Sequence, residues 1–200
     1  LGDVYKRQVG TDCSVGKMFT ALAIERDMRG RGFSADFRAT GQTGIFIAGT
    51  GVSIDAVISD FVSGAVEWLT PANDPDHWDV VEGQGSLFHA SYAGVTLGLV
   101  HGAQPDALVL CHEPTRSHMR GLPHYRLPDL PLAIERHVEA AQLTNPAARC
   151  IGLSVNTGGL DPGAARDYLR RTEDRLALPC VDPVRTGVGP IVDRLAARRA

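Results

Sequence analysis

The sequence GTDCSVGK at residues 10–17 has the form G-x-x-x-x-G-K, which is typical of a phosphate-binding P-loop. Gly10 and Gly16 allow the backbone to turn tightly, so that successive N–H groups point at one anion. Lys17 adds a positive charge, and apolar residues recur at helical spacing over residues 18–28. The N-terminus of that helix would face the same anion. We therefore expect a phosphate cradle here rather than a flexible glycine-rich turn.

The residue after Lys17 departs from the pattern. In a loop that binds a nucleoside triphosphate this residue is Ser or Thr, whose hydroxyl coordinates magnesium. Here it is Met18, whose thioether is a poor ligand for a hard cation. The motif therefore predicts a loop that holds phosphates, and Met18 argues against magnesium-dependent hydrolysis of ATP.

The composition is that of one globular domain. The chain has 200 residues, of which 44% are hydrophobic and 6% aromatic, which argues against a disordered chain and against a membrane protein. Its apolar runs are too short to span a bilayer, and no signal peptide is visible. Because the net charge is −3, no basic face for nucleic acid is implied. We expect neither nucleic acid nor a membrane as a partner.

The four cysteines are widely spaced and form no C-x-x-C pair. This spacing predicts reduced thiols in a cytoplasmic protein rather than a disulfide or zinc framework. His112, His118 and His124 are six residues apart, but this matches no recognised ligand spacing. We therefore predict no metal site.

Apolar segments that read as strands alternate with amphipathic segments that read as helices. The strands are expected at residues 33–39, 79–82, 107–111, 150–155 and 179–181, and the helices at residues 18–28, 53–69, 88–101, 130–142, 161–176 and 190–197. This alternation, with glycine turns after the strands, predicts an α/β fold of the P-loop NTPase kind, in which a mostly parallel sheet carries helices on both faces.

Residues 1–8 do not fit the buried apolar strand that should precede a P-loop, because Asp3, Lys6, Arg7 and Gln8 interrupt it. Two explanations stay open. Residues 1–8 are a cloning or assembly remnant that replaces the natural strand, in which case the chain is a C-terminal fragment of a longer protein. Alternatively, they are a polar but real first strand.

Polar residues follow the strands at the edge where parallel sheets bind ligands. The turn TGQTG at residues 40–44 supplies hydroxyls, an amide and backbone N–H groups, and the turn EGQGS at residues 82–86 begins with an acid. Glu82 would stand beside the P-loop strand, where a carboxylate orients a metal or a water. The alternative for Glu82 is a strand-end residue bonded to nearby N–H groups. We expect Asp55 and Asp60 to be solvated or capping residues.

The segment after the strand at 107–111 carries three histidines and three arginines between residues 112 and 126. Its prolines exclude a helix, and it falls at the ligand-facing edge of the sheet. Arg116 and Arg120 suit a substrate carboxylate or phosphate, because arginine makes paired hydrogen bonds to such groups. The alternative is a solvated loop with scattered histidines.

Four motifs together, at residues 10–18, 40–44, 81–86 and 112–116, resemble the C-terminal P-loop domain of the D-glutamate N-acetyltransferase family, a bacterial family formerly of unknown function. The resemblance covers nearly all of residues 9–200. It implies that these residues form a C-terminal domain, which a Rossmann-like domain precedes in the family. It also implies transfer of an acetyl group from acetyl-CoA to D-glutamate in D-glutamate catabolism.

The first motif also resembles that of dethiobiotin synthetase, an ATP-dependent ligase with the same kind of sheet. In that family Thr follows the lysine, so Met18 departs from its pattern. Two alternatives to the acetyltransferase therefore stay open: a ligase or kinase that uses ATP with magnesium, and a non-catalytic nucleotide-binding module.

The phosphates of coenzyme A need no magnesium hydroxyl ligand, so a P-loop followed by Met18 suits acetyl-CoA better than hydrolysable ATP. The residues expected to bind the cofactor are Gly10, Thr11, Asp12, Ser14, Val15, Gly16, Lys17 and Asn156. Those expected to bind a small amino-acid substrate are Thr40, Gln42, Thr43, Gln84, Ser86, Arg116 and Arg120.

Two residues are candidates for the catalytic base that removes a proton from the amine. Glu82 needs burial to raise its pKa, whereas an unperturbed His112 titrates near neutrality. Its position favours Glu82, and His112 stays open as the alternative. We also expect a homo-oligomer.

Overall fold

The structure, a computed structural model, describes residues 4–197 and contains one parallel six-stranded sheet in the order β2-β3-β1-β4-β7-β8. A separate antiparallel hairpin pairs β5 with β6. The strands are β1 (Val4–Gly10), β2 (Ala35–Arg38), β3 (Trp78–Val81), β4 (Ala107–His112), β5 (His118–Met119), β6 (Leu122–Arg126), β7 (Arg149–Val155) and β8 (Cys180–Val181).

The connections are mostly helical, as a parallel sheet requires. The α-helices are α1 (Lys17–Gly30), α2 (Gln42–Ala48), α3 (Val62–Leu69), α4 (Ala93–Ala103), α5 (Leu130–Gln142), α6 (Pro162–Leu176) and α7 (Gly189–Ala196). Two single turns of 3-10 helix, η1 (Ile54–Ala56) and η2 (Ser59–Phe61), precede α3.

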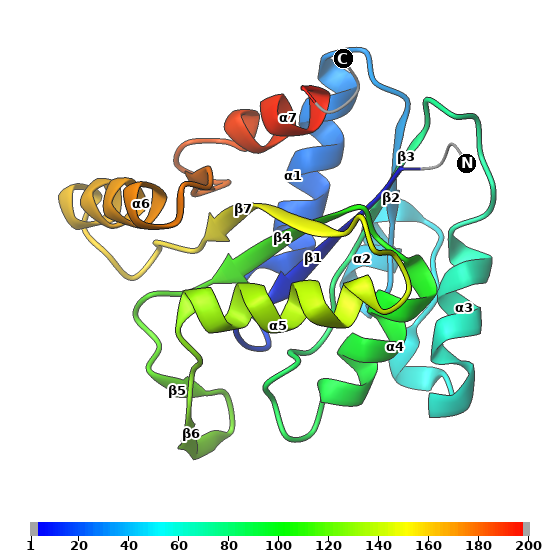
Figure 1. The fold of residues 1–200 in the computed structure, drawn as a ribbon, viewed down its shortest axis with the longest axis horizontal. Coiled ribbons are helices and arrows are strands. Elements are labelled where there is room, and N and C mark those ends of the chain that lie inside the picture. The colour runs from blue at the N-terminus through cyan, green and yellow to red at the C-terminus, as the bar shows by residue number, and fades with distance from the viewer. Residues whose placement is uncertain (1–3, 198–200) are drawn as a thin grey trace.

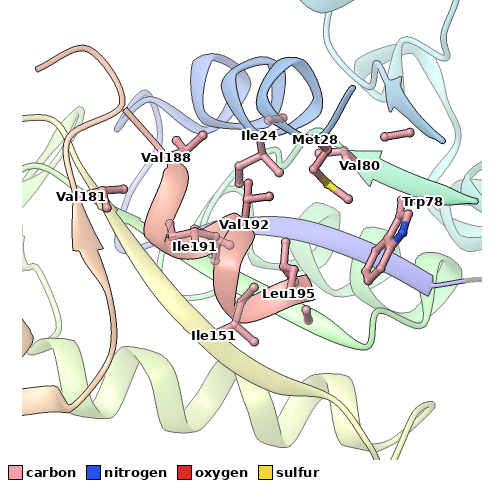
Figure 2. Packing of buried hydrophobic residues seen from close by; sticks show 14 residues of the cluster. Ile24, Met28, Trp78, Val80, Ile151, Val181, Val188, Ile191, Val192 and Leu195 are labelled. Atoms are coloured by element: carbon pink, nitrogen blue, oxygen red, sulfur yellow. The ribbon is translucent and has the colours of Figure 1, made fainter. Parts of the chain in front are cut away.

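Helices cover both faces of the sheet, which confirms the expected fold class (Figure 1). On one face α1 and α7 pack on the strands through a buried cluster that includes Ile24, Trp78 and Ile191, and Figure 2 shows how closely its side chains fit. On the other face α5 and α6 pack through a second cluster that includes Leu110 and Leu169. Burial of these two apolar layers stabilises the sheet and fixes the edge where its strands end.

The polar segment before the P-loop forms β1 in the middle of the sheet, paired with β3 and β4. Gln8 is fully buried there, and neither the oxygen nor the nitrogen of its side-chain amide has a hydrogen-bond partner among the described residues. Residues 4–10 thus form a polar strand, residues 1–3 lie outside the described part, and the explanation of residues 1–8 as a remnant stays a prediction. The proposed domain boundary at residue 9 stays a prediction.

The single helix expected at residues 53–69 is wrong. Val57 and Ile58 have extended backbone angles, so the segment breaks into η1, η2 and the shorter α3. The apolar periodicity is real because Ile54, Val62 and Val66 share one buried cluster. Tertiary packing, rather than a continuous helix, brings them together.

The helix expected at residues 88–101 begins only at Ala93, because two tight turns come first, with N–H bonds from His89 to Ser86 O and from Tyr92 to His89 O. The glycines of α4 allow it to pack closely against α3. A Cβ on Gly98 would stand 2.6 Å from Val62 Cγ1, and one on Gly102 would stand 2.4 Å from Ser63 O.

The expected helices at residues 130–142 and 161–176 agree with the structure at their boundaries, and each begins with an aspartate cap. Asp129 accepts a hydrogen bond from Leu132 N, and Asp161 accepts from Gly163 N and Ala164 N.

Among the described residues, no helix is long and apolar enough to cross a membrane.

Candidate functional site

The P-loop connects the end of β1 to the start of α1 and has the backbone shape of an anion-binding nest. Ser14 and Gly16 both have positive φ angles, of 54° and 100°. The backbone N–H groups of Cys13, Ser14 and Gly16 donate no hydrogen bond to any described residue. The side chain of Lys17 bends back over the loop and donates to Asp12 O at 2.8 Å. These groups fit a phosphate, which accepts hydrogen bonds from N–H and ammonium groups.

Asp12 braces the loop from inside rather than facing the ligand. Its carboxylate is fully buried, and its Oδ2 accepts from Arg116 Nη1 at 2.7 Å and from the backbone N–H of Arg120 at 2.8 Å. Arg116 also donates to Cys13 O at 2.8 Å and to Glu113 Oε2 at 2.6 Å. Arg116 thus ties the segment after β4 to the P-loop, and it does not line the cleft described next.

A cleft of about 750 Å³ opens beside the P-loop, on the side of β3. Its basic lining residues are Lys17 and Arg120, which are cationic, and its acidic lining residues are Glu82 and Asp55, which are anionic when ionised. The rest of its wall is made by Cys13, Ser14, Gly16, Met18, Phe19, Gly83, Gln84, Gly85, Tyr92, Val95 and Gly121. The mixture of both charges with an apolar wall suits a zwitterionic substrate beside an apolar chain.

Glu82 follows β3 directly and stands at the floor of the cleft with 3% of its surface exposed. Its Oε2 accepts from Thr40 N at 2.9 Å and from Gly41 N at 3.0 Å. Burial raises the pKa of the Glu82 carboxyl, and hydrogen bonds from Thr40, Gly41 and Gln84 together with the charge of Lys17 oppose that rise. Glu82 is therefore bonded to nearby N–H groups, as one interpretation expected, and it also lines the cleft, where its functional role stays a prediction.

The other turn residues expected around the substrate separate into two groups. Gln84 lines the cleft, whereas Thr40 is buried and donates through its hydroxyl to Glu82 O at 2.9 Å, so it holds Glu82 in place. The turn expected at 40–44 is instead the start of α2, which carries Gln42 and Thr43 exposed on its surface and outside the cleft. Ser86 is fully buried and accepts from Phe88 N at 3.3 Å.

His112, the last residue of β4, lies on the other side of β1 and does not line the cleft. Its Nδ1 is hydrogen-bonded to Thr11 Oγ1 at 3.0 Å, and its ring stacks on Tyr168 of α6 at a centroid distance of 6.3 Å. Burial lowers the pKa of His112 to about 4, so the expectation that it titrates near neutrality is wrong. At neutral pH His112 is an uncharged packing residue.

Two smaller hollows lie on the far side of Phe19, which lines all three. The hollow next to the P-loop, of about 150 Å³, contains Val15, Gly16 and the exposed Asn156. The next, of about 430 Å³, runs along α1. The structure therefore places the expected cofactor residues Ser14, Gly16 and Lys17 at the main cleft, and Val15 and Asn156 at the neighbouring hollow. The remaining three, Gly10, Thr11 and Asp12, are buried beneath them.

Sequence reasoning missed several lining residues. Asp55, expected to be a solvated or capping residue, stands in the cleft wall because buried Ile54 anchors η1, with Ile54 N donating to Thr40 O at 3.1 Å. Tyr92 and Val95 reach the cleft from the N-terminal part of α4. Phe19 belongs to the apolar pattern that predicted a helix at residues 18–28, and 48% of its surface is exposed. Because its spacing fits a helix, nothing in the sequence indicated that Phe19 lines the cleft.

Asp12, Cys13 and His89 each offer one ligand atom, and these atoms all lie within 4.8 Å of one another. Both nitrogens of His89 are already hydrogen-bonded, to Arg120 O and to Ser91 N. The nearby charges of Lys17, Arg116 and Arg120 would also repel a cation. The donor set therefore does not fit a metal ion.

Comparison with known proteins identifies relatives over most of the chain. A family model described as "Domain of unknown function (DUF1611_C) P-loop domain" matches residues 7–192. Two curated relatives are named D-glutamate N-acetyltransferase. The one from Tritonibacter scottomollicae is 59% identical over 94% of this chain and 57% of its own length. The one from Pseudoalteromonas sp is 51% identical over 97% of this chain and 60% of its own length. The chain thus spans about three fifths of the length of these relatives.

Solved structures agree with the fold. A DUF1611 family protein from Anabaena variabilis superimposes with a TM-score of 0.92 at 36% identity, over 98% of this chain and 58% of that one. Cobyrinic acid a,c-diamide synthase from Mycobacterium smegmatis, solved with ADP and magnesium, has a TM-score of 0.56 at 14% identity, over 100% of this chain and 95% of that one. The second likeness is one of fold alone. The P-loop α/β fold and the resemblance found in the sequence are thereby confirmed.

Proposed function

Because the chain belongs to the DUF1611 C-terminal P-loop domain family, whose curated relatives are named D-glutamate N-acetyltransferase, we propose that it carries the active site of an amino-acid N-acetyltransferase. The proposed donor is acetyl-CoA and the proposed acceptor is the amino group of D-glutamate. The observation that carries the proposal is that one cleft is lined by a P-loop in which Met18 follows the lysine, by the buried carboxylate of Glu82, and by Asp55 and Arg120.

The P-loop would hold the diphosphate of coenzyme A. The unengaged N–H groups of Cys13, Ser14 and Gly16 supply donors, and Lys17 supplies charge. Met18 stands in the cleft wall where a magnesium-binding hydroxyl would stand in an ATP-hydrolysing protein. A diphosphate needs no such hydroxyl, which favours coenzyme A over ATP. The apolar wall of Phe19, Tyr92 and Val95 gives the pantetheine arm room to turn back toward Glu82.

The amino-acid substrate would lie between Arg120 and the two acids. Arg120 is fixed at its backbone, with its N–H on Asp12 and its carbonyl on His89, while its guanidinium reaches Ser14 Oγ at 2.5 Å. A guanidinium held in this way is placed to form hydrogen bonds with a substrate carboxylate. Asp55 has no hydrogen bond or ion pair to another described residue through its side chain, and it faces the same cleft. It is the group best placed to attract the substrate ammonium.

Acetyl transfer needs a neutral amine and a stabilised carbonyl oxygen. Acetyl-CoA, when bound, would supply an acetyl group activated as a thioester, whose C–S bond breaks as the amide bond forms, so that coenzyme A leaves as the thiol. Glu82 would accept the proton from the substrate ammonium, and its raised pKa makes it a stronger base than an exposed glutamate. The Gln84 amide is a donor in the cleft that would stabilise negative charge on the carbonyl oxygen.

The direct test incubates the purified chain with acetyl-CoA and D-glutamate, and measures thiol release together with the appearance of N-acetyl-D-glutamate. L-glutamate in place of D-glutamate tests chirality. Calorimetric titration with acetyl-CoA and, separately, with Mg-ATP identifies the nucleotide that binds. Product formation that depends on acetyl-CoA supports the proposal. Binding of Mg-ATP with no binding of acetyl-CoA would replace it with an ATP-dependent ligase or a nucleotide-binding module.

A further inference from the structure

The hollow of about 430 Å³ along α1 has no role in the function proposed above. It is bounded on one side by the outer face of α1 and on the other by the segment between β8 and α7. Its lining consists of Phe19, Leu22, Ala23, Arg26, Asp27, Pro183, Gly187 and Val188. Val188 also belongs to the buried cluster between α1 and α7 that Figure 2 shows, so this wall of the hollow is anchored in the core.

The hollow is separated from the P-loop by one smaller hollow, with which it shares part of its lining. It shares Phe19 and Pro183 with the small hollow that contains Gly16 and Asn156, and Gly16 in turn lines the main cleft. A ligand whose phosphates lie on the P-loop can therefore extend in two directions, into the main cleft or along α1. Phe19, half exposed, and Pro183 offer flat apolar surfaces for a heteroaromatic ring on the second path.

The charge in this hollow comes from Arg26. Its guanidinium is exposed and makes no ion pair or hydrogen bond with any other described residue. The neighbouring Asp27 is neutralised, because its Oδ1 lies 2.5 Å from Arg31 Nε. Arg31 also forms an ion pair with Asp193, in which Arg31 Nη1 lies 2.5 Å from Asp193 Oδ1. Of the charged residues in the lining, Arg26 is thus the one available to an anionic ligand.

The position of Arg26 on α1 sets the place of that anion. Arg26 follows Lys17 by nine residues, which is about 13 Å along an α-helix. Helical side chains point back toward the N-terminus, so the guanidinium lies closer to the P-loop than its Cα does. The anion would therefore stand beyond the phosphates on the P-loop, at the far side of a ring or sugar.

We propose that the hollow along α1 binds the adenosine end of coenzyme A, and that Arg26 contacts its 3′-phosphate. This inference rests on the proposed function. Coenzyme A carries a phosphate on the ribose as well as the diphosphate, and the two are separated by the sugar. ATP has no phosphate at that position. Arg26 therefore gives this site a preference for a 3′-phosphorylated nucleotide, which the P-loop alone would not provide.

The test compares binding of acetyl-CoA with binding of 3′-dephospho-acetyl-CoA, by calorimetry on the purified chain. A charge-assisted hydrogen bond at a partly exposed site predicts that the wild type binds acetyl-CoA about tenfold more tightly. Arg26→Ala should weaken acetyl-CoA binding about tenfold and leave 3′-dephospho-acetyl-CoA binding unchanged, so that the preference disappears. Arg26→Lys should keep part of it. Arg29→Ala is the matched control, because Arg29 is on the same helix, outside the hollow, and paired with Glu25.

The outcomes separate this inference from the proposed function. Equal affinities of the wild type for the two ligands would overturn the role of Arg26 and leave acetyl-CoA as the donor. Weakening of both ligands alike by Arg26→Ala would do the same, since the substitution would then act on the fold or on the diphosphate. If the wild type binds neither ligand, the proposed donor is wrong and the inference fails with it.

Discussion

The ends of β3 and β4 have equivalent places in the sheet, on either side of β1, but their titratable residues have different surroundings. Each strand pairs with β1, each is buried along its length, and each leads to a titratable residue at the same edge of the sheet. Glu82 after β3 stands in the cleft. His112 at the end of β4 is enclosed by Thr11 and the ring of Tyr168.

Burial has opposite consequences for these two residues as bases. Removal from water disfavours the charged form of each, so it raises the pKa of Glu82 and lowers the pKa of His112 to about 4. A carboxylate thereby becomes a stronger base, and an imidazole becomes a weaker one. The same physical effect therefore favours Glu82 over His112 as the base in the proposed reaction.

The largest effect is expected from Glu82→Gln. The amide oxygen of Gln can still accept from Thr40 N and Gly41 N, so the fold should survive, whereas the base is lost. Turnover of D-glutamate should fall by about 10²- to 10⁴-fold, while calorimetry should show acetyl-CoA binding within a few-fold of the wild type.

The pH dependence and a matched variant sharpen this prediction. Because the pKa of Glu82 is raised, kcat/KM in the wild type should decline on the acid side at a pH above the ordinary range for glutamate. That limb should be absent from the residual activity of Glu82→Gln. His112→Asn is the control and should keep most of the turnover. A larger loss in His112→Asn than in Glu82→Gln would reverse the assignment of the base.

The sequence predicted the sheet, its parallel strands and the P-loop because these depend on local patterns. Buried strands are short apolar runs, and the G-x-x-x-x-G-K motif fixes its own backbone, as Ser14 and Gly16 show. The boundaries of α5 and α6 were also predictable, since an aspartate cap and a proline define each start. Where no such signal exists, as at η1 and η2, periodicity alone predicts one continuous helix, and that prediction is wrong.

The composition of the site was less predictable, because it depends on which side of β1 each loop covers. Arg116 and Arg120 are four residues apart in one polar segment, yet the first is enclosed by Asp12 and Glu113 while the second lines the cleft. Asp55 differs from Arg116 in that it lines the cleft although no motif in the sequence around it predicts a site residue. Its place follows from the packing of Ile54 beneath it, which is a tertiary contact.

The next largest effect is expected on the free energy of unfolding, from a substitution in the segment that follows β4. Arg116→Ala removes the guanidinium that pairs with the fully buried Asp12, and an uncompensated buried charge destabilises a protein by about 3 kcal/mol. Urea unfolding should show this loss. The control is Arg136→Ala, because both partners of its ion pair with Glu139 are half exposed, and it should change the free energy of unfolding by less than about 1 kcal/mol. Equal effects of the two variants would mean that Arg116 does not brace the P-loop.

An effect that approaches the same size only at acid pH is expected from His112→Asn. The unfolded chain takes up a proton at His112 near the ordinary histidine pKa of 6.5, whereas the folded protein does so only near pH 4. The contribution of neutral His112 to stability is therefore complete above pH 6.5 and is lost as the pH falls toward 4, by up to about 3 kcal/mol. Subtracting the unfolding curves of the variant from those of the wild type at several pH values isolates this loss. A difference that stays constant between neutral pH and pH 4 would contradict the buried setting of His112.

The smallest effect is expected from the second acid of the cleft. Asp55→Asn removes the charge that would attract the substrate ammonium, and this should raise KM for D-glutamate about tenfold with kcat nearly unchanged. Glutarate, which has both carboxylates but no amine, should inhibit the variant and the wild type equally. Asp60→Asn on η2 lies outside the cleft lining and should behave as wild type. If Asp55→Asn instead lowers kcat as far as Glu82→Gln does, the two acids share the proton transfer. Separate roles, with the base directly after β3 and the ammonium site on η1, would then be wrong.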